Sequence, residues 1–175
     1  GYDSGSYFYN QDISKWDTGN VTDMSSMCKN TGYNSFFNSN ISKWNTGKVK
    51  DMSSMFDNAI WIWDPELGSG GTDLSKWDTS NVTDMSSMFK TNTPYKGKYI
   101  FNQDLSDWDV SNVTDMNSMF YRAEKFNQDI SNWNTSSVTD MNRMFTNASV
   151  FNQPLNTDGN KWNVSLVTDM NSMFL

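Results

Sequence analysis

Apolar and polar residues follow one another along the chain in a block that recurs six times. The block reads Val-Thr-Asp-Met-Ser/Asn-Ser-Met-Phe in its commonest form, and its copies start at Val21, Val49, Val82, Val113, Val138 and Val167. The two tightest spacings, from Phe120 to Phe145 and from Phe126 to Phe151, give a period of 25 residues. Self-similarity at such a period predicts a solenoid, in which each repeat contacts only its neighbours.

Two local patterns succeed each other within a period. Around Trp108, the spacing apolar-x-x-Trp-x-Thr/Val places Trp108 and Val110 on one face of a short strand. The following apolar residues fall at i, i+3, i+4 and i+7, as on an amphipathic helix: Met116, Met119, Phe120 and Ala123. The Thr-Asp ahead of them supplies a cap for that helix. These patterns predict an α/β repeat solenoid with short parallel strands on one face and short helices on the other.

One unit cannot bury its own large side chains, so neighbouring units must bury them together. A tryptophan stands five residues before each block, and we expect these six residues to be structural core: Trp16, Trp44, Trp77, Trp108, Trp133 and Trp162. The methionine stripes are interpreted as core filling rather than as a metal or peptide surface. We expect a single domain over 1–175 with repeats at about 9–36, 37–69, 70–100, 101–125, 126–150 and 151–175.

Composition excludes several kinds of chemistry. The net charge is −7, the only two arginines are Arg122 and Arg143, and no basic stripe for nucleic acid is present. The chain has no histidine and one cysteine, Cys28, which excludes His-based triads, His-bearing zinc sites and an internal disulfide. No apolar run approaches the ~20 residues of a bilayer span. We therefore expect no enzyme activity, no cofactor and no bound metal, and a chain that is a piece of a longer protein.

The string FNQDISNWNTSSVTDMNRMF at 126–145 resembles the bacterial surface protein 26-residue repeat, also called the DUF285 repeat of mycoplasma lipoproteins. Its spacing is also similar to the core of leucine-rich repeats of the BspA-like type. The resemblance covers essentially the whole chain, and it departs at Cys28, at Gly70-Gly71 and at the insertion before Trp162. What the resemblance implies is a leucine-rich-repeat-like parallel-sheet solenoid, a bacterial extracellular or cell-surface location, and a role in cell adhesion or surface variation.

The return segments after three consecutive blocks are longer than the others, at 29–36, 57–69 and 90–100. Insertions at one register of a solenoid project from one side, so these segments should lie together. Their aromatic residues are candidates for binding a sugar or an apolar patch of a partner: Tyr33, Phe36, Trp61, Trp63, Tyr95 and Tyr99. The alternative is that residues 60–63 fold back as a lid on the core.

Aspartates also recur in register, and their simplest role is to stabilise the first turn of each helix. Asp104, Asp107 and Asp109 offer oxygens to Ca²⁺, but no EF-hand loop surrounds them. Glycosylation sequons occur at Asn20, Asn81, Asn112, Asn134, Asn147 and Asn163. They are acceptors only in a eukaryotic secretory host, and we interpret these asparagines as turn residues. Cys28 is interpreted as a buried apolar group.

The leading hypothesis is a non-enzymatic extracellular repeat domain for recognition or adhesion, with a protein or glycan of a host or neighbouring cell as its partner. The alternative is a structural role, as a self-associating spacer or filament subunit. The final residues Met173 and Phe174 lie inside the apolar stripe with nothing after them to cover it. Association through the ends of the array would therefore favour the alternative.

Overall fold

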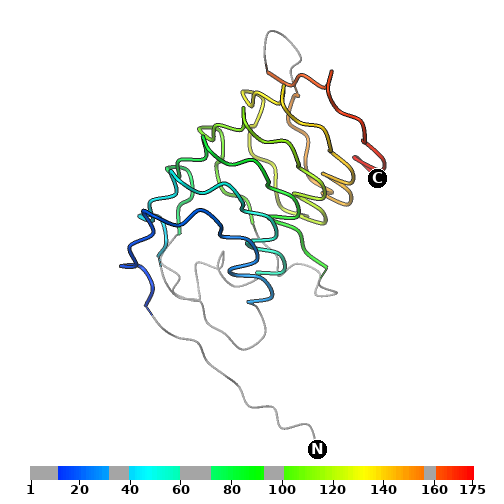
Figure 1. The fold of residues 1–175 in the computed structure, drawn as a ribbon. Helices are drawn as coiled ribbons and strands as arrows, with labels where there is room; N and C mark the ends of the chain where they lie inside the picture. Colours follow the sequence, from blue (N-terminus) through cyan, green and yellow to red (C-terminus); the bar gives the residue numbers. More distant parts are fainter. Residues whose placement is uncertain (1–11, 32–39, 60–71, 93–100, 156–160) are drawn as a thin grey trace, which may run out of the picture.

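The computed structural model describes residues 12–31, 40–59, 72–92, 101–155 and 161–175. These residues form six successive coils stacked in a row, with the first coil in blue and the last in red at opposite ends of the stack (Figure 1). The coils meet through parallel bridges between equivalent aspartates: Asp23 with Asp51, Asp51 with Asp84, Asp84 with Asp115, Asp115 with Asp140 and Asp140 with Asp169. The coils are therefore held in one register along the whole stack.

The predicted α/β architecture is wrong. The described residues contain no helix, and their only β-structure is these isolated bridges, so neither the short parallel strands nor the leucine-rich-repeat-like helices are present. No helix long and apolar enough to cross a membrane occurs in this part of the chain. What replaces regular structure is a succession of four-residue turns.

The stretch predicted as a helix shows how these turns work. The N–H groups of Met119 and Ala123 donate to the carbonyls three residues earlier, at 3.2 and 3.0 Å. Ser118 and Arg122, each at the third position of such a turn, have φ angles of 55° and 58°. A left-handed residue at that position is typical of type II turns and breaks a helix. The apolar spacing i, i+3, i+4 and i+7 thus arises here from turns rather than from a helix.

The turns leave every second N–H group free to bind the next coil. Met116, Ser118, Phe120 and Arg122 donate to the carbonyls of Asp140, Asn142, Met144 and Thr146, at distances of 2.8–3.0 Å. A helix would satisfy its N–H groups internally, but an isolated helix of this length has only marginal stability in water. The neighbouring coil offers acceptors at the right spacing, and the turn conformation uses them.

The aspartates that were expected to cap helices have a different role. Each accepts a hydrogen bond from the backbone N–H two residues later at 2.7–2.8 Å, as Asp115 does from Asn117. This is an Asx turn, in which the side chain mimics a backbone turn. Two more ranks of Asx turns precede and follow the tryptophans, with Asp104 and Asp109 as the acceptors in the fourth coil. Many of the polar side chains therefore form hydrogen bonds that stabilise the turns of the backbone.

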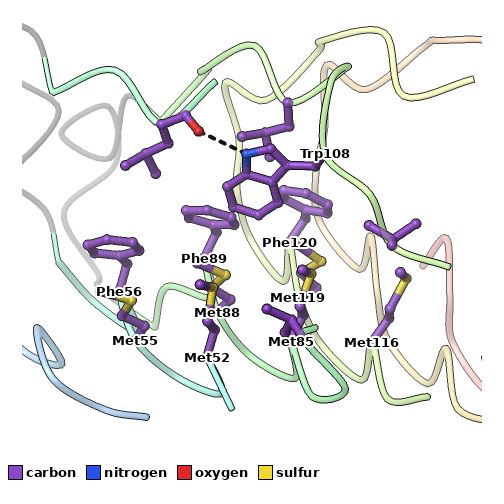
Figure 2. Packing of buried hydrophobic residues seen from close by; sticks show 14 of the residues in the cluster. Met52, Met55, Phe56, Met85, Met88, Phe89, Trp108, Met116, Met119 and Phe120 are labelled. Atoms are coloured by element: carbon purple, nitrogen blue, oxygen red, sulfur yellow. Dashed lines mark hydrogen bonds between the residues drawn. The ribbon is translucent and has the colours of Figure 1, made fainter. Parts of the chain in front are cut away.

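Methionine and phenylalanine side chains fill the interior of the stack in parallel rows (Figure 2). One row runs through Phe56, Phe89, Phe120, Phe145 and Phe174, with successive ring centroids 5.5–5.7 Å apart. A second row, Phe101, Phe126 and Phe151, stacks against the first, and Phe120 lies 4.0 Å from Phe126 between centroids. Each coil thus completes the hydrophobic environment of its neighbours.

Tryptophans form a further row that links adjacent coils. Five of the six are buried, and each of the five donates its indole N–H to a carbonyl of the preceding coil, as Trp108 does to Leu74 at 2.9 Å (Figure 2). Trp16 does not belong to the buried set: its side chain stacks on Trp44, but it is 56% exposed. No coil precedes Trp16 among the described residues, and none of these residues covers the outer face of its ring.

Candidate functional site

The six aromatic residues predicted to bind a ligand, Tyr33, Phe36, Trp61, Trp63, Tyr95 and Tyr99, lie outside the described residues. The structure does describe the points at which their segments leave the coils. The N–H of Asn30 donates to the carbonyl of Asp57 at 2.7 Å, and that of Asn58 donates to the carbonyl of Lys90 at 2.8 Å. The three long segments therefore start from adjacent points of three consecutive coils.

An ion pair lies at the base of these segments. Lys29 Nζ is 3.0 Å from Asp57 Oδ2, and the Asp57 side chain is only 5% exposed. The other carboxylate oxygen, Oδ1, has no hydrogen-bond partner among the described residues. Burial of a carboxylate without a compensating charge costs free energy. The ion pair with Lys29 offsets this cost for Asp57.

The three aspartates considered as a Ca²⁺ site have other contacts in the structure. Asp104 and Asp109, which were considered as Ca²⁺ ligands, each accept a backbone N–H in an Asx turn. Asp107 instead forms an exposed ion pair with Lys76 at 2.8 Å. No group of three or more Asp, Glu, Cys or His residues suited to a metal ion occurs in the described part of the chain.

The environment of each carboxylate determines the direction of its pKa shift. Hydrogen bonds from Ser25 hold the pKa of Asp23 below its ordinary value, and Ser80 does the same for Asp78. Burial raises the pKa of Asp115, and the negative charges of Asp84 and Asp140 in the adjacent coils add to this. Stacking one carboxylate per coil therefore creates a weakly repulsive rank in the middle of the array.

The other candidates from the sequence have structural contacts. Cys28 is buried, and desolvation raises the pKa of its thiol to about 12, so it is a neutral apolar side chain. The sequon asparagines Asn81 and Asn112 donate their side-chain amides to carbonyls of the preceding coil, Gly47 and Ser80, at 2.8 and 2.7 Å. These amides contribute to the contact between coils.

An apolar face is exposed on the coil of residues 161–175. Val164, Leu166 and Met170 are 40–56% exposed, and Phe174 is 63% exposed. A hollow of about 300 Å³ adjoins this face, lined by Phe145, Phe151, Phe174 and Leu175 among others. Met173 and Phe174 were both predicted to be uncovered: Phe174 is exposed, but Met173 is buried at 8% exposure, so the prediction was wrong for Met173. The repeat pattern gave no sign that Trp16 is exposed at the other end of the stack.

The family model described as "Mycoplasma protein of unknown function, DUF285" matches the chain in two segments, residues 3–65 and 66–175. No curated protein and no solved structure matches the chain. The two segments together cover nearly all of the sequence. The chain therefore belongs to the DUF285 family, as the resemblance of its repeats predicts.

Proposed function

We propose that this member of the DUF285 family is a non-enzymatic extracellular repeat domain of a surface protein, which recognises a protein or glycan on a host or neighbouring cell. The stack of coils is the rigid support, and the three long segments form the contact surface. The observation that carries this proposal is the adjacency of their bases, bonded from Asn30 to Asp57 and from Asn58 to Lys90. Segments that start side by side present their aromatic residues to the same partner.

The use of the polar groups on the stack supports the same proposal. Asx turns, three in each of the first five coils and two in residues 161–175, occupy many of the Asp and Asn side chains. Bonds between coils occupy others, as in the ladder in which the hydroxyls of Thr83, Thr114, Thr139 and Thr168 donate to carbonyls of the preceding coil. Groups held in this way support the backbone and are poorly placed to act as acids or bases. We therefore assign recognition of the partner to residues that are not required to stabilise the coils.

The test is binding of the whole chain to an array of glycans and host-matrix proteins. If the wild type binds a ligand on the array, replacement of Trp61 and Trp63 together by Ala should abolish that binding. The thermal midpoint of unfolding should not change. Tyr121→Ala is the matched control, because Tyr121 is a partly exposed aromatic residue that follows a block with a short return segment. Unchanged binding with a much lower midpoint in the double variant would identify 60–63 as a lid on the core and overturn the proposal.

A further inference from the structure

One rank of threonines lies exposed at the same position of successive coils. The second residue of the last four blocks is a threonine with an exposed side chain: Thr83, Thr114, Thr139 and Thr168. The backbone N–H of each donates to the carbonyl of the equivalent residue in the preceding coil at 2.8 Å. The hydroxyl of each donates to the same carbonyl at 3.1 Å. All four threonines are therefore held in the same conformation, hydroxyl group included.

A second rank of polar side chains lies beside the first, two residues earlier in each coil. Asn81 and Asn112 donate their side-chain amides, and Ser137 donates its hydroxyl, to carbonyls of the preceding coil at 2.6–2.8 Å. The residue between the two ranks is a fully buried valine in each of these coils: Val82, Val113 and Val138. Alternate residues of an extended backbone point to opposite sides, so both ranks face outward.

The two ranks form an uncharged face, which we call the threonine face: Asn81, Thr83, Asn112, Thr114, Ser137, Thr139 and Thr168. In the coil of residues 40–59 the equivalent positions hold Lys48 and Lys50, so the uncharged face starts at the next coil. The side chains use their donors inside the stack, but a hydroxyl oxygen that donates its hydrogen still has lone pairs that accept. The threonine face therefore presents hydrogen-bond acceptors and methyl groups.

The spacing of the threonine face is regular in two directions. Parallel bridges between the aspartates that follow the threonines hold successive coils in register, and bridged chains lie about 4.8 Å apart. Within a coil, extended positions two residues apart are separated by roughly 6.6 Å. A partner that engages the whole face must offer donors at fixed intervals in both directions. A crystal lattice meets this requirement, whereas a small solute or a flexible chain does not.

We propose that the threonine face binds ice. The water molecules of an ice surface donate hydrogen bonds from fixed lattice positions, and the face offers acceptors and methyl groups in a fixed array. Side chains that are already ordered lose little entropy on binding, and an uncharged face has no charge to desolvate. A crystalline polysaccharide also presents an array of hydroxyl groups, but sugar rings pack on aromatic side chains, and neither rank contains one.

The first test is whether the whole chain enters ice. A dilute solution is frozen slowly on a cold probe, and the fraction of the protein in the ice is measured, since a protein without affinity for ice is excluded from it. The wild type should be enriched in the ice, and Thr114→Lys should be excluded. Lysine fits this position of the fold, because Lys50 is the equivalent residue in the coil of residues 40–59.

Ser149→Lys is the matched control for the lysine variant. It adds the same charge at an exposed position of a return segment, away from the threonine face, and it should be enriched in ice like the wild type. The double replacement of Trp61 and Trp63 by Ala should also leave the enrichment unchanged. Ice binding and the recognition function proposed above can therefore fail independently.

A variant that extends the face gives a result that damage to the fold cannot imitate. Lys48→Asn combined with Lys50→Thr adds one coil to the threonine face, with residues that later coils use at these positions. This variant should widen the gap between the melting and freezing temperatures of ice crystals in the protein solution, relative to the wild type.

Three results would overturn the proposal. The first is a wild type that is excluded from ice, including one that is instead retained by crystalline cellulose or chitin. The second is a Thr114→Lys variant that is enriched in ice as strongly as Ser149→Lys. The third is a gap between melting and freezing that does not widen when the face is extended.

Discussion

The same octapeptide, Val-Thr-Asp-Met-Asn-Ser-Met-Phe, occurs in an interior coil at 113–120 and in the last coil at 167–174. Both copies form the same turn, in which Met119 and Met173 donate to carbonyls three residues earlier at 3.2 Å. Both also form the same Asx turn at 2.8 Å, on Asp115 and Asp169. The local backbone conformation is thus a property of the block itself.

Burial differs sharply between the two copies. Met116 and Phe120 are fully buried at 0% exposure, whereas Met170 is 42% and Phe174 63% exposed. The sequence is identical, so the difference comes from the coil that follows the interior copy. In this fold the block determines its own turns, and the neighbouring coil determines how much of it is core. Stability should therefore depend on position in the stack more than on residue type.

The largest expected effect is the contrast between Phe120→Ala and Phe174→Ala. Loss of a fully buried phenylalanine costs about 3–5 kcal/mol through lost burial and the cavity left behind. Phe174 stacks on Phe145 on one side only, so its loss should cost less than about 1 kcal/mol. Urea unfolding followed by circular dichroism measures both. Equal losses would show that burial in the stack does not depend on the following coil.

A smaller contrast is expected between Trp108→Phe and Trp16→Phe. The Trp108 indole N–H bonds the Leu74 carbonyl at 2.9 Å, and that carbonyl then keeps only its bond from the Trp77 N–H. Loss of the bond and of part of the ring should cost about 1–3 kcal/mol. Trp16 is half exposed and its indole has no acceptor among the described residues, so its replacement should be nearly neutral. The urea midpoints of the two variants, compared with the wild type, test this.

The sequence predicted the stacked organisation of the core better than its secondary structure. Most of the periodic methionines, phenylalanines and tryptophans are residues that the coils bury, because apolar spacing indicates which side chains face inward whatever the backbone conformation. A helix and a chain of type II turns both bring positions i, i+3, i+4 and i+7 to one side. The spacing alone could not distinguish them.

A signal for turns was present in the polar residues. Asp or Asn stands two residues before Ser, Gly or Asn at three points of each coil, as at Asp104, Asp109 and Asp115 in the fourth. Ser and Asn also occupy most of the positions with positive φ, including Ser118 and Asn147. Such residues compete with helix formation by binding nearby backbone groups. The binding surface remains a prediction, because its aromatic residues lie outside the described part of the chain.

The smallest contrast concerns one rank of aspartates, Asp115 in the interior and Asp23 at the end. The pKa of Asp115 is raised, so its ionised form is less favourable in the folded state and it lowers stability at pH values above its folded pKa. The pKa of Asp23 is lowered, so its charge favours folding above its unfolded pKa and that contribution is lost as the pH falls through the folded value.

Substitution by Asn keeps the side-chain acceptor and removes the charge. Asp115→Asn should therefore be slightly more stable than the wild type at neutral pH, and the gap should close as the pH falls from the folded pKa of Asp115 to its unfolded value near 3.8. Asp23→Asn should be slightly less stable at neutral pH and equal to the wild type in acid. Thermal midpoints measured from neutral to acidic pH give both signs. Shifts of the same sign in the two variants would mean that an interior carboxylate experiences no more burial or repulsion than one at the end of the stack.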